Sequence, residues 1–152
     1  MAAIEFRLIR NDISPDIRRK LRKMKNPRPV LEAIGEQLVS LTRRAFTDAS
    51  LRPSIWPPRK KAVSWQILRK SGTLWKSIRI TETTNTSVTV GTDRPYAAVH
   101  QLGSRKSTGR GGGIPASPFF PVIGKKLTAI ARKKIDQAAH VKFDAMLLKA
   151  RG

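Results

Sequence analysis

The sequence of 152 residues contains no cysteine. Without thiols it has neither disulfide bonds nor thiolate metal ligands, and nothing in it suggests an oxidising compartment. It also lacks long apolar runs: no early segment resembles a cleavable signal peptide, and every apolar stretch is far too short to cross a bilayer. We therefore expect a protein that is made and used in a cytoplasm.

The sequence also contains few acidic residues. Ten Asp and Glu stand against 31 Lys and Arg, which gives a formal net charge of +21. A chain with this balance repels itself and attracts polyanions, so DNA, RNA and anionic membranes are the candidate partners. No basic amphipathic segment carries the bulky aromatic face of an interfacial helix, and the composition therefore favours nucleic acid over membrane. A ribosome-type RNA binder and a merely basic surface are the alternatives from composition.

Groups that could carry catalysis or hold a metal are also few. His100 and His140 are the two histidines; they fall on different predicted helices, whereas a zinc site needs three or four ligands. We expect His100 to be structural and His140 to lie on the exposed face of a basic helix. Glu32 and Glu36 are typical of helix surface, and Asp93 is placed to cap a short helix. Because a nuclease needs clustered acids to hold magnesium, we predict no enzyme activity, no metal and no cofactor.

The length suits a single domain over residues 1–152, including a basic N-terminal arm and strand at residues 1–28. Apolar residues alternate in some segments and follow helical spacing in others. The expected order is a strand at 4–9, a basic helix or half-ordered arm at 14–25, a helix at 29–49, a hairpin at 74–90, a short helix at 96–102 and a final helix at 122–149. This order indicates an α+β fold, in which an antiparallel sheet packs with a long helix from the N-terminal half and a long C-terminal helix.

Apolar stripes define the two long helices. The first stripe consists of Val30, Leu31, Ile34, Leu38, Leu41 and Ala45. The second consists of Leu127, Ile130, Ala131, Ile135, Ala138, Val141 and Ala145. Gly35 weakens the first helix slightly and allows close packing. Gly91 is expected to end the second strand of the hairpin, and Gly103 the short helix.

Two segments combine charge with residues that prevent regular structure. Residues 50–64 hold three prolines, so we expect an extended surface loop that holds Trp56 in a pocket. Trp75 is expected to be a second anchor, in a strand. Residues 104–113 contain no apolar residue and should form a flexible basic loop, which contacts phosphates or simply faces solvent. The predicted DNA-proximal residues are Arg59, Lys60, Lys61, Arg105, Lys106 and Arg110. The run from Arg18 to Lys25 is a second candidate, for DNA or for an acidic partner.

Several short motifs occur in a fixed order between about residues 40 and 125. They are Arg43-Arg44-Ala45-Phe46, Trp56-Pro57-Pro58, Ile67-Leu68-Arg69-Lys70-Ser71-Gly72-Thr73-Leu74 followed by Ser77-Ile78, Val88-Thr89-Val90-Gly91-Thr92, Tyr96-Ala97-Ala98-Val99-His100-Gln101-Leu102-Gly103 and Ile114-Pro115-Ala116-Ser117-Pro118-Phe119-Phe120. In these motifs the chain resembles the phage virion morphogenesis family, the neck and tail-completion proteins of Mu-like and related tailed phages. The motif residues expected to support the fold are Trp56, Gly72, Leu74, Gly91, Tyr96, His100, Gly103, Pro115, Pro118 and Phe119.

The resemblance implies a structural virion protein of the head–tail connector, or neck. Such a protein is a ring-forming stopper, or a tail-completion or terminator component, that surrounds DNA and joins head to tail. The implied partners are further copies in a cyclic ring of six or twelve, neighbours such as the adaptor, portal or tail terminator, and double-stranded DNA in the channel. It would be located at the head–tail junction of the virion after assembly in the host cytoplasm. The alternatives are a free nucleic-acid-binding protein without a virion role and, third, an enzyme such as a nuclease.

Overall fold

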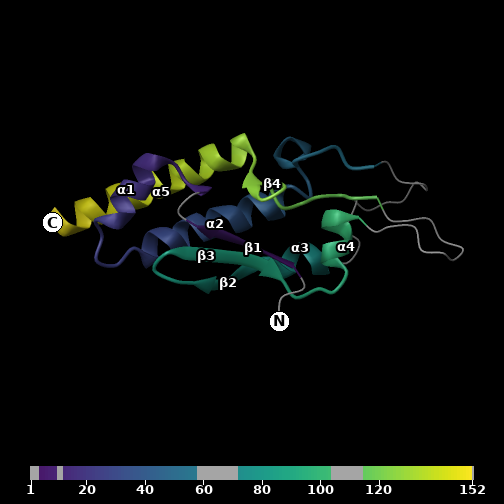
Figure 1. Ribbon diagram of the computed structural model, residues 1–152, viewed down its shortest axis with the longest axis horizontal. Helices are drawn as coiled ribbons and strands as arrows, with labels where there is room; N and C mark the ends of the chain where they lie inside the picture. Colours follow the sequence, from purple (N-terminus) through teal and green to yellow (C-terminus); the bar gives the residue numbers. More distant parts are fainter. Residues whose placement is uncertain (1–3, 10–11, 58–71, 104–114, 152) are drawn as a thin grey trace, which may run out of the picture.

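The computed structural model describes residues 4–9, 12–57, 72–103 and 115–151. Its elements are stacked in three layers (Figure 1). Helix α2 (Arg28–Arg44) lies in the middle, with the long helix α5 (Ala129–Arg151) and the short helix α1 (Pro15–Arg22) on one side and a three-stranded antiparallel sheet on the other. The predicted α+β fold, with a sheet packed against two long helices, is confirmed.

The sheet joins strands that lie far apart in the sequence. The strands are β1 (Ile4–Ile9), β2 (Arg79–Thr83) and β3 (Ser87–Thr92). β3 is central and pairs with both neighbours, so the order is β1-β3-β2. The register sets Phe6 opposite Val90 and Leu8 opposite Val88, and these alternate side chains share the face toward the core. The predicted strand at 4–9 and the β2–β3 hairpin are therefore confirmed, the hairpin beginning later than expected.

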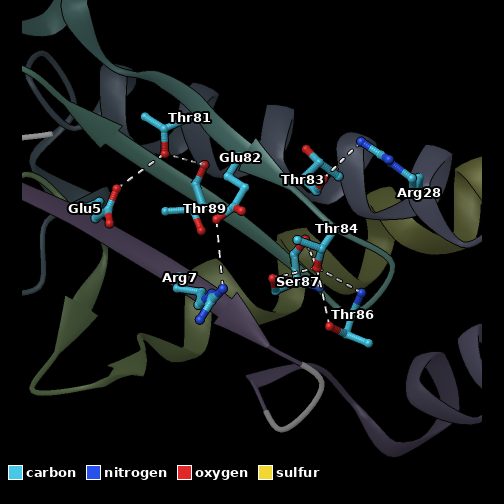
Figure 2. Close-up of polar contacts among 10 residues, drawn as sticks. All are labelled: Glu5, Arg7, Arg28, Thr81, Glu82, Thr83, Thr84, Thr86, Ser87 and Thr89. Atoms are coloured by element: carbon cyan, nitrogen blue, oxygen red, sulfur yellow. Dashed lines mark hydrogen bonds and ion pairs between the residues drawn. The ribbon is translucent and has the colours of Figure 1, made fainter. Parts of the chain in front are cut away.

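The opposite face of the sheet is polar (Figure 2). Arg7 of β1 pairs with Glu82 of β2 at 3.9 Å across the buried Thr89 of β3. Thr81 Oγ1 lies 3.4 Å from Thr89 O and 3.5 Å from Glu5 Oε2, within hydrogen-bonding distance of both acceptors. One apolar face and one polar face are typical of an antiparallel sheet that covers a core from one side.

Two arginines of α2 hold the ends of the edge strand β2. Arg28 Nη2 donates to Thr83 O at 3.0 Å (Figure 2), and Arg43 Nη2 donates to Ile78 O at 2.7 Å. Thr84 Oγ1 then closes the turn to β3 by accepting two backbone N–H groups, at 3.2 and 3.0 Å. The edge strand is thereby fixed to the helix beneath it as well as to β3.

The prediction that the first strand of the hairpin begins at residue 74 is wrong. Residues Thr73–Ser77 form the short helix α3, so Trp75 lies in a helix and not in a strand. Leu74 and Ile78 are both buried, at helical spacing, and Ser77 Oγ donates to Leu74 O at 2.6 Å to close the turn. Over so few residues, the spacing of apolar side chains in one helical turn looks like the alternation of a strand.

The stripe predicted for the first long helix is confirmed, since all six of its side chains are buried. The helix ends at Arg44 and not at residue 49, because residues 45–47 form turns and Asp48 caps a short 3-10 helix (Ala49–Leu51) by accepting the N–H of Ser50 at 3.0 Å.

Gly35 of α2 faces the sheet: a Cβ there would lie 2.5 Å from Val88 Cγ2. Close packing at Gly35 is therefore confirmed. Of the two alternatives for residues 14–25, a basic helix or a half-ordered arm, the structure shows the helix, α1. Ser14 Oγ caps it by accepting the N–H of Ile17.

The final helix begins seven residues later than predicted, at Ala129 and not at 122. Residues before it form a small hairpin, β4 (Val122–Ile123) and β5 (Lys126–Leu127), whose turn contains Gly124 at φ +63°. The buried stripe is Ala131, Ile135, Ala139 and Phe143. Ala131 and Ile135 were predicted correctly, but Ile130 and Val141 are 48% and 69% exposed and Ala145 is exposed. Buried residues of α5 follow one another at intervals of four. Val141 lies midway between Ala139 and Phe143 in the sequence and therefore points to the outer side of the helix.

Gly91 does not end β3, as the sequence suggested, but lies within it, opposite Glu5 and Arg79. A Cβ at Gly91 would lie 2.7 Å from Ile4 O and 2.8 Å from Glu5 Cβ. We expect Gly91→Ala to lower the free energy of unfolding by about 1–3 kcal/mol, because β1 must move away from β3. Urea unfolding followed by circular dichroism measures this effect.

The matched control is Gly124→Asn. A Cβ at Gly124 meets nothing within 4 Å, and asparagine tolerates the positive φ of this turn. The control should change the free energy of unfolding by less than about 0.5 kcal/mol. Equal effects of the two substitutions would show that close approach of β1 is not what requires glycine at position 91.

Candidate nucleic-acid interface

Exposed cations are distributed along the layer formed by α1 and α5. We use the term α1–α5 basic surface for the exposed arginines and lysines of these two helices and of the residues that follow α1. They are Arg19, Arg22, Lys23, Lys25, Arg132, Lys133 and Lys149. This layer lies on the side of α2 opposite the sheet (Figure 1). Cations fixed on packed helices meet a polyanion with less loss of conformational entropy than cations on a free chain.

Helix α1 is attached to α5 by a polar cluster around Asp16. The Asp16 carboxylate lies 3.5 Å from Lys20 Nζ, 3.8 Å from Arg19 Nη2 and 3.6 Å from His140 Nε2 of α5. Lys20 Nζ also lies 3.3 Å from His140 Nδ1. His140 therefore joins the two helices, while 42% of its side-chain surface stays exposed, so its predicted exposed position is confirmed only in part. Its ring is half-buried because α1 covers it.

Further contacts fix the start of α1. The N–H of Ser14 donates to Asp136 Oδ1 at 3.3 Å, and Arg132 Nη2 lies 3.5 Å from Ile13 O. Ile17 and Leu21 are buried beneath α1 in the common core. Two of the ten acidic residues, Asp16 and Asp136, are thus used to hold the two helices together.

An aromatic cluster lies at the other end of α2, where several of the quoted motifs meet. Trp56 is buried, and its Nε1–H donates to Pro118 O at 2.8 Å. Gln101 Oε1 accepts the backbone N–H of Phe119 at 2.9 Å and of Phe120 at 3.0 Å. These bonds connect α4 (Ala97–Leu102) and the residues around Trp56 to segment 115–121. The predicted pocket for Trp56 is confirmed.

Aromatic stacking completes this cluster. The Phe46 ring lies 5.2 Å from Phe119 and 5.9 Å from Trp56, and Phe119 lies 5.1 Å from Phe120, between ring centroids. The Arg52 guanidinium lies 3.6 Å from the centroid of the Trp56 ring, and its Nε donates to Ala45 O at 2.6 Å. Trp56 is thus an anchor and not an exposed platform for a base.

The described residues offer no group of three or more His, Asp or Glu side chains that could hold a metal ion. Asp93 does not cap the short helix α4. It pairs instead with Arg79 at 3.6 Å and with Arg94 at 3.5 Å. Glu32 and Glu36 are exposed, as expected. Among the helices of the described ranges, none is long and apolar enough to span a membrane.

Comparison with known proteins agrees with the motifs. Residues 11–140 match the phage virion morphogenesis family. The chain belongs to this family. The match runs from the residues before α1 to His140, so it includes the polar cluster around Asp16 and the aromatic cluster. As a member of a structural phage morphogenesis family, the chain is a virion morphogenesis protein.

One curated relative of this phage family is the Mu-like prophage FluMu G protein 2 of Haemophilus influenzae. It is 49% identical over 106 residues, which cover 59% of this chain and 77% of the relative. No solved structure matches the chain. The chain is therefore similar to a Mu-like G protein, and the resemblance drawn from the motifs is confirmed.

The family-motif residues have structural roles where the structure describes them. Gly72 and Gly103 adopt φ +70° and +76°, at the start of α3 and the end of α4. Leu74 and Phe119 are buried. Tyr96 is 42% exposed and contacts the His100 ring edge-on at 5.9 Å. The carbonyl of His100 accepts the N–H of Ser117 at 2.6 Å. Pro115 is exposed, and Pro118 is buried and accepts from Trp56.

The six DNA-proximal residues predicted from the sequence lie outside the described residues. Arg59, Lys60 and Lys61 belong to the range 58–71, and Arg105, Lys106 and Arg110 to the range 104–114, which also contains the predicted flexible loop. In the chain these two ranges directly follow Pro57 and Gly103, at the aromatic cluster. The six residues therefore stay predictions, and the α1–α5 basic surface contains most of the second predicted candidate, the run from Arg18 to Lys25.

Sequence reasoning missed Gln101 and Arg52. Gln101 is buried, with 8% exposure, and satisfies two backbone donors of the motif that contains Phe119. No local pattern marks such a glutamine, since its partners lie 18 and 19 residues away. Arg52 contacts Trp56, and the aromatic residue four positions later is a signal for such a cation–aromatic contact.

His100 should make the stability of the folded protein depend on pH. Burial lowers the pKa of His100 below its usual value of 6.5. The unfolded chain therefore takes up a proton at a higher pH than the folded chain, and the folded state loses stability as pH falls below about 6.5. Chemical unfolding between about pH 7 and 5 should show this loss, and His100→Gln should reduce it. The same pH slope in both proteins would contradict this role of His100.

Proposed function

We propose that this protein is a non-enzymatic structural component of the phage head–tail connector. In this proposal it assembles as a cyclic ring of six or twelve copies, as stopper or as tail-completion or terminator component, and double-stranded DNA passes through the channel. Its neighbours in the virion would be the portal, the adaptor or the tail terminator. Family membership supports the virion role, and the charge distribution supports the proximity to DNA.

The α1–α5 basic surface is the observation that carries the proposal. All ten acidic residues lie within the described ranges, and on the α1–α5 layer they are Asp16, Asp136 and Asp144. Two of these three are held between the helices, which leaves the exposed cations in excess. A surface of this kind contacts phosphates at any sequence, as a passage for packaged DNA requires. Arg59, Lys60, Lys61, Arg105, Lys106 and Arg110 would add to these phosphate contacts.

A ring distinguishes this function from that of a free nucleic-acid-binding protein. We expect the purified protein, alone or added to portal complexes, to form closed rings visible by negative-stain electron microscopy. Light scattering would then give a mass of several subunits, independent of added DNA. A monomer or dimer that binds DNA and never joins a portal complex would favour the free nucleic-acid-binding protein instead.

A further inference from the structure

A second surface, away from the α1–α5 basic surface, has a different character. An open groove of about 550 Å³ lies where α2 runs along the edge strand β2. Its floor is apolar, formed by the half-buried side chains of Val39 and Ile80. Its rim carries Arg43, Arg44 and Arg79, with Glu36 as the one carboxylate. The volume lies in the range of about 300–1,000 Å³ that is typical of ligand pockets.

Neither Arg43 nor Arg44 forms a direct ion pair, although the Asp48 carboxylate lies near enough to Arg44 for the arginine charge to help lower the pKa of Asp48. All ten acidic residues of the chain lie in the described ranges, and none forms an ion pair within 4.0 Å with Arg43 or Arg44. Arg43 uses Nη2 for the carbonyls of Ile78 and Lys76, at 2.7 and 3.4 Å, while its buried Nε has no hydrogen-bond partner among the described residues. Arg79 pairs with Asp93 at 3.6 Å. Beside the apolar floor the groove therefore holds Arg43, which no carboxylate pairs with, and the exposed Arg44, which makes no direct ion pair.

This combination fits a protein segment better than DNA. A phosphate backbone has no apolar group to cover Val39 and Ile80. A peptide segment can place an apolar side chain on the floor and a carboxylate against the exposed Arg44, whose guanidinium group binds carboxylates in a fork. Charge complementarity with a chain of net charge +21 also favours an acidic partner.

We infer that this groove is a docking site for an acidic segment of a partner protein, in which an apolar residue lies next to Asp or Glu. The inference does not depend on DNA contact by the α1–α5 basic surface, so either can fail without the other. Arg43 both borders the groove and holds the start of β2, whereas Arg44 and Ser40 belong to the groove without such a bond of their side chains. Arg44 and Ser40 are therefore the positions for substitution.

The test uses a library of random displayed peptides, selected on the full-length protein and counter-selected on Ser40→Phe, whose ring fills the groove. Selected peptides are then synthesised with a fluorescent label, and their affinity is measured by polarisation. We expect an apolar residue beside Asp or Glu in the selected peptides. Arg44→Glu should weaken their binding at least about tenfold, since it places like charges in contact. Thermal melting checks that both variants are folded.

The matched control is Lys125→Glu, an equal change of charge on the exposed turn between β4 and β5. It should alter peptide affinity less than about twofold. A short DNA duplex should lose no more affinity with Arg44→Glu than with Lys125→Glu. The inference is overturned if selection enriches no peptide over Ser40→Phe, if the peptides lack acidic residues, or if Arg44→Glu and Lys125→Glu act alike. A duplex that displaces the peptide would instead assign the groove to DNA.

Discussion

Phe119→Ala should lower the free energy of unfolding by about 3–5 kcal/mol. The Phe119 ring is fully buried and contacts the rings of Phe46 and Phe120. Its removal leaves a cavity that cannot collapse easily, because Gln101 and Trp56 fix the backbone of the same segment by hydrogen bonds. A domain of this size has a total stability of about 5–15 kcal/mol, so the loss is a large part of it. Equilibrium unfolding in urea measures it.

Leu102→Ala is the control for this prediction. Leu102 lies at the end of α4, one residue from Gln101, but it is 73% exposed. Its truncation should cost less than about 0.5 kcal/mol, because little apolar surface is buried there. Small and equal losses for Phe119→Ala and Leu102→Ala would mean that the aromatic cluster does not stabilise the fold.

DNA binding should fall steeply with salt and should weaken when the α1–α5 basic surface is neutralised. For each phosphate that the protein no longer neutralises, the slope of log affinity against log salt should become less negative by about 0.9. The variant combines Arg22→Gln, Lys23→Gln, Lys133→Gln and Lys149→Gln, four exposed positions outside the Asp16 cluster. Polarisation of a labelled duplex over a series of salt concentrations gives both slopes.

Base sequence should have little effect on this binding. The proposed interface rests on charge, and contacts with phosphates carry no sequence information. Duplexes of unrelated sequence should therefore bind with similar affinity. An unchanged salt slope in the neutralised variant would contradict the role of the α1–α5 basic surface, and a strong preference for one duplex would contradict phosphate recognition.

The parts of the fold predicted correctly are those with long periodic patterns. The stripe of α2 continues over four turns, from Val30 to Ala45, and only one face of a helix explains it. Short segments failed: the helical turn around Trp75 looked like a strand, and the β4–β5 hairpin was assigned to the last helix. In that helix, Ile130 and Val141 are apolar but exposed, and the spacing alone could not show which face meets α2.

Local sequence patterns also could not predict where in the fold the exposed cations lie. Composition gives the sign and size of the net charge, but the attachment of α1 to α5 depends on contacts such as Ser14 with Asp136, which are 122 residues apart in the chain. The same holds for Trp56 and Pro118, 62 residues apart. Motif order indicated the family, because a fixed sequence of short motifs is more specific than any one of them.

Retention of packaged DNA tests the central claim most directly. Particles would be assembled with a variant in which Arg105, Lys106 and Arg110 are replaced by serine, and with the neutralised α1–α5 variant. We expect ring formation and docking to the neighbouring ring to be normal in both, while DNA leaks from the particles faster than from wild-type particles, measured by nuclease-accessible DNA over time. Normal DNA retention together with failed docking would contradict the proposed role at the DNA channel, and would show that the charge serves an acidic neighbouring protein rather than DNA.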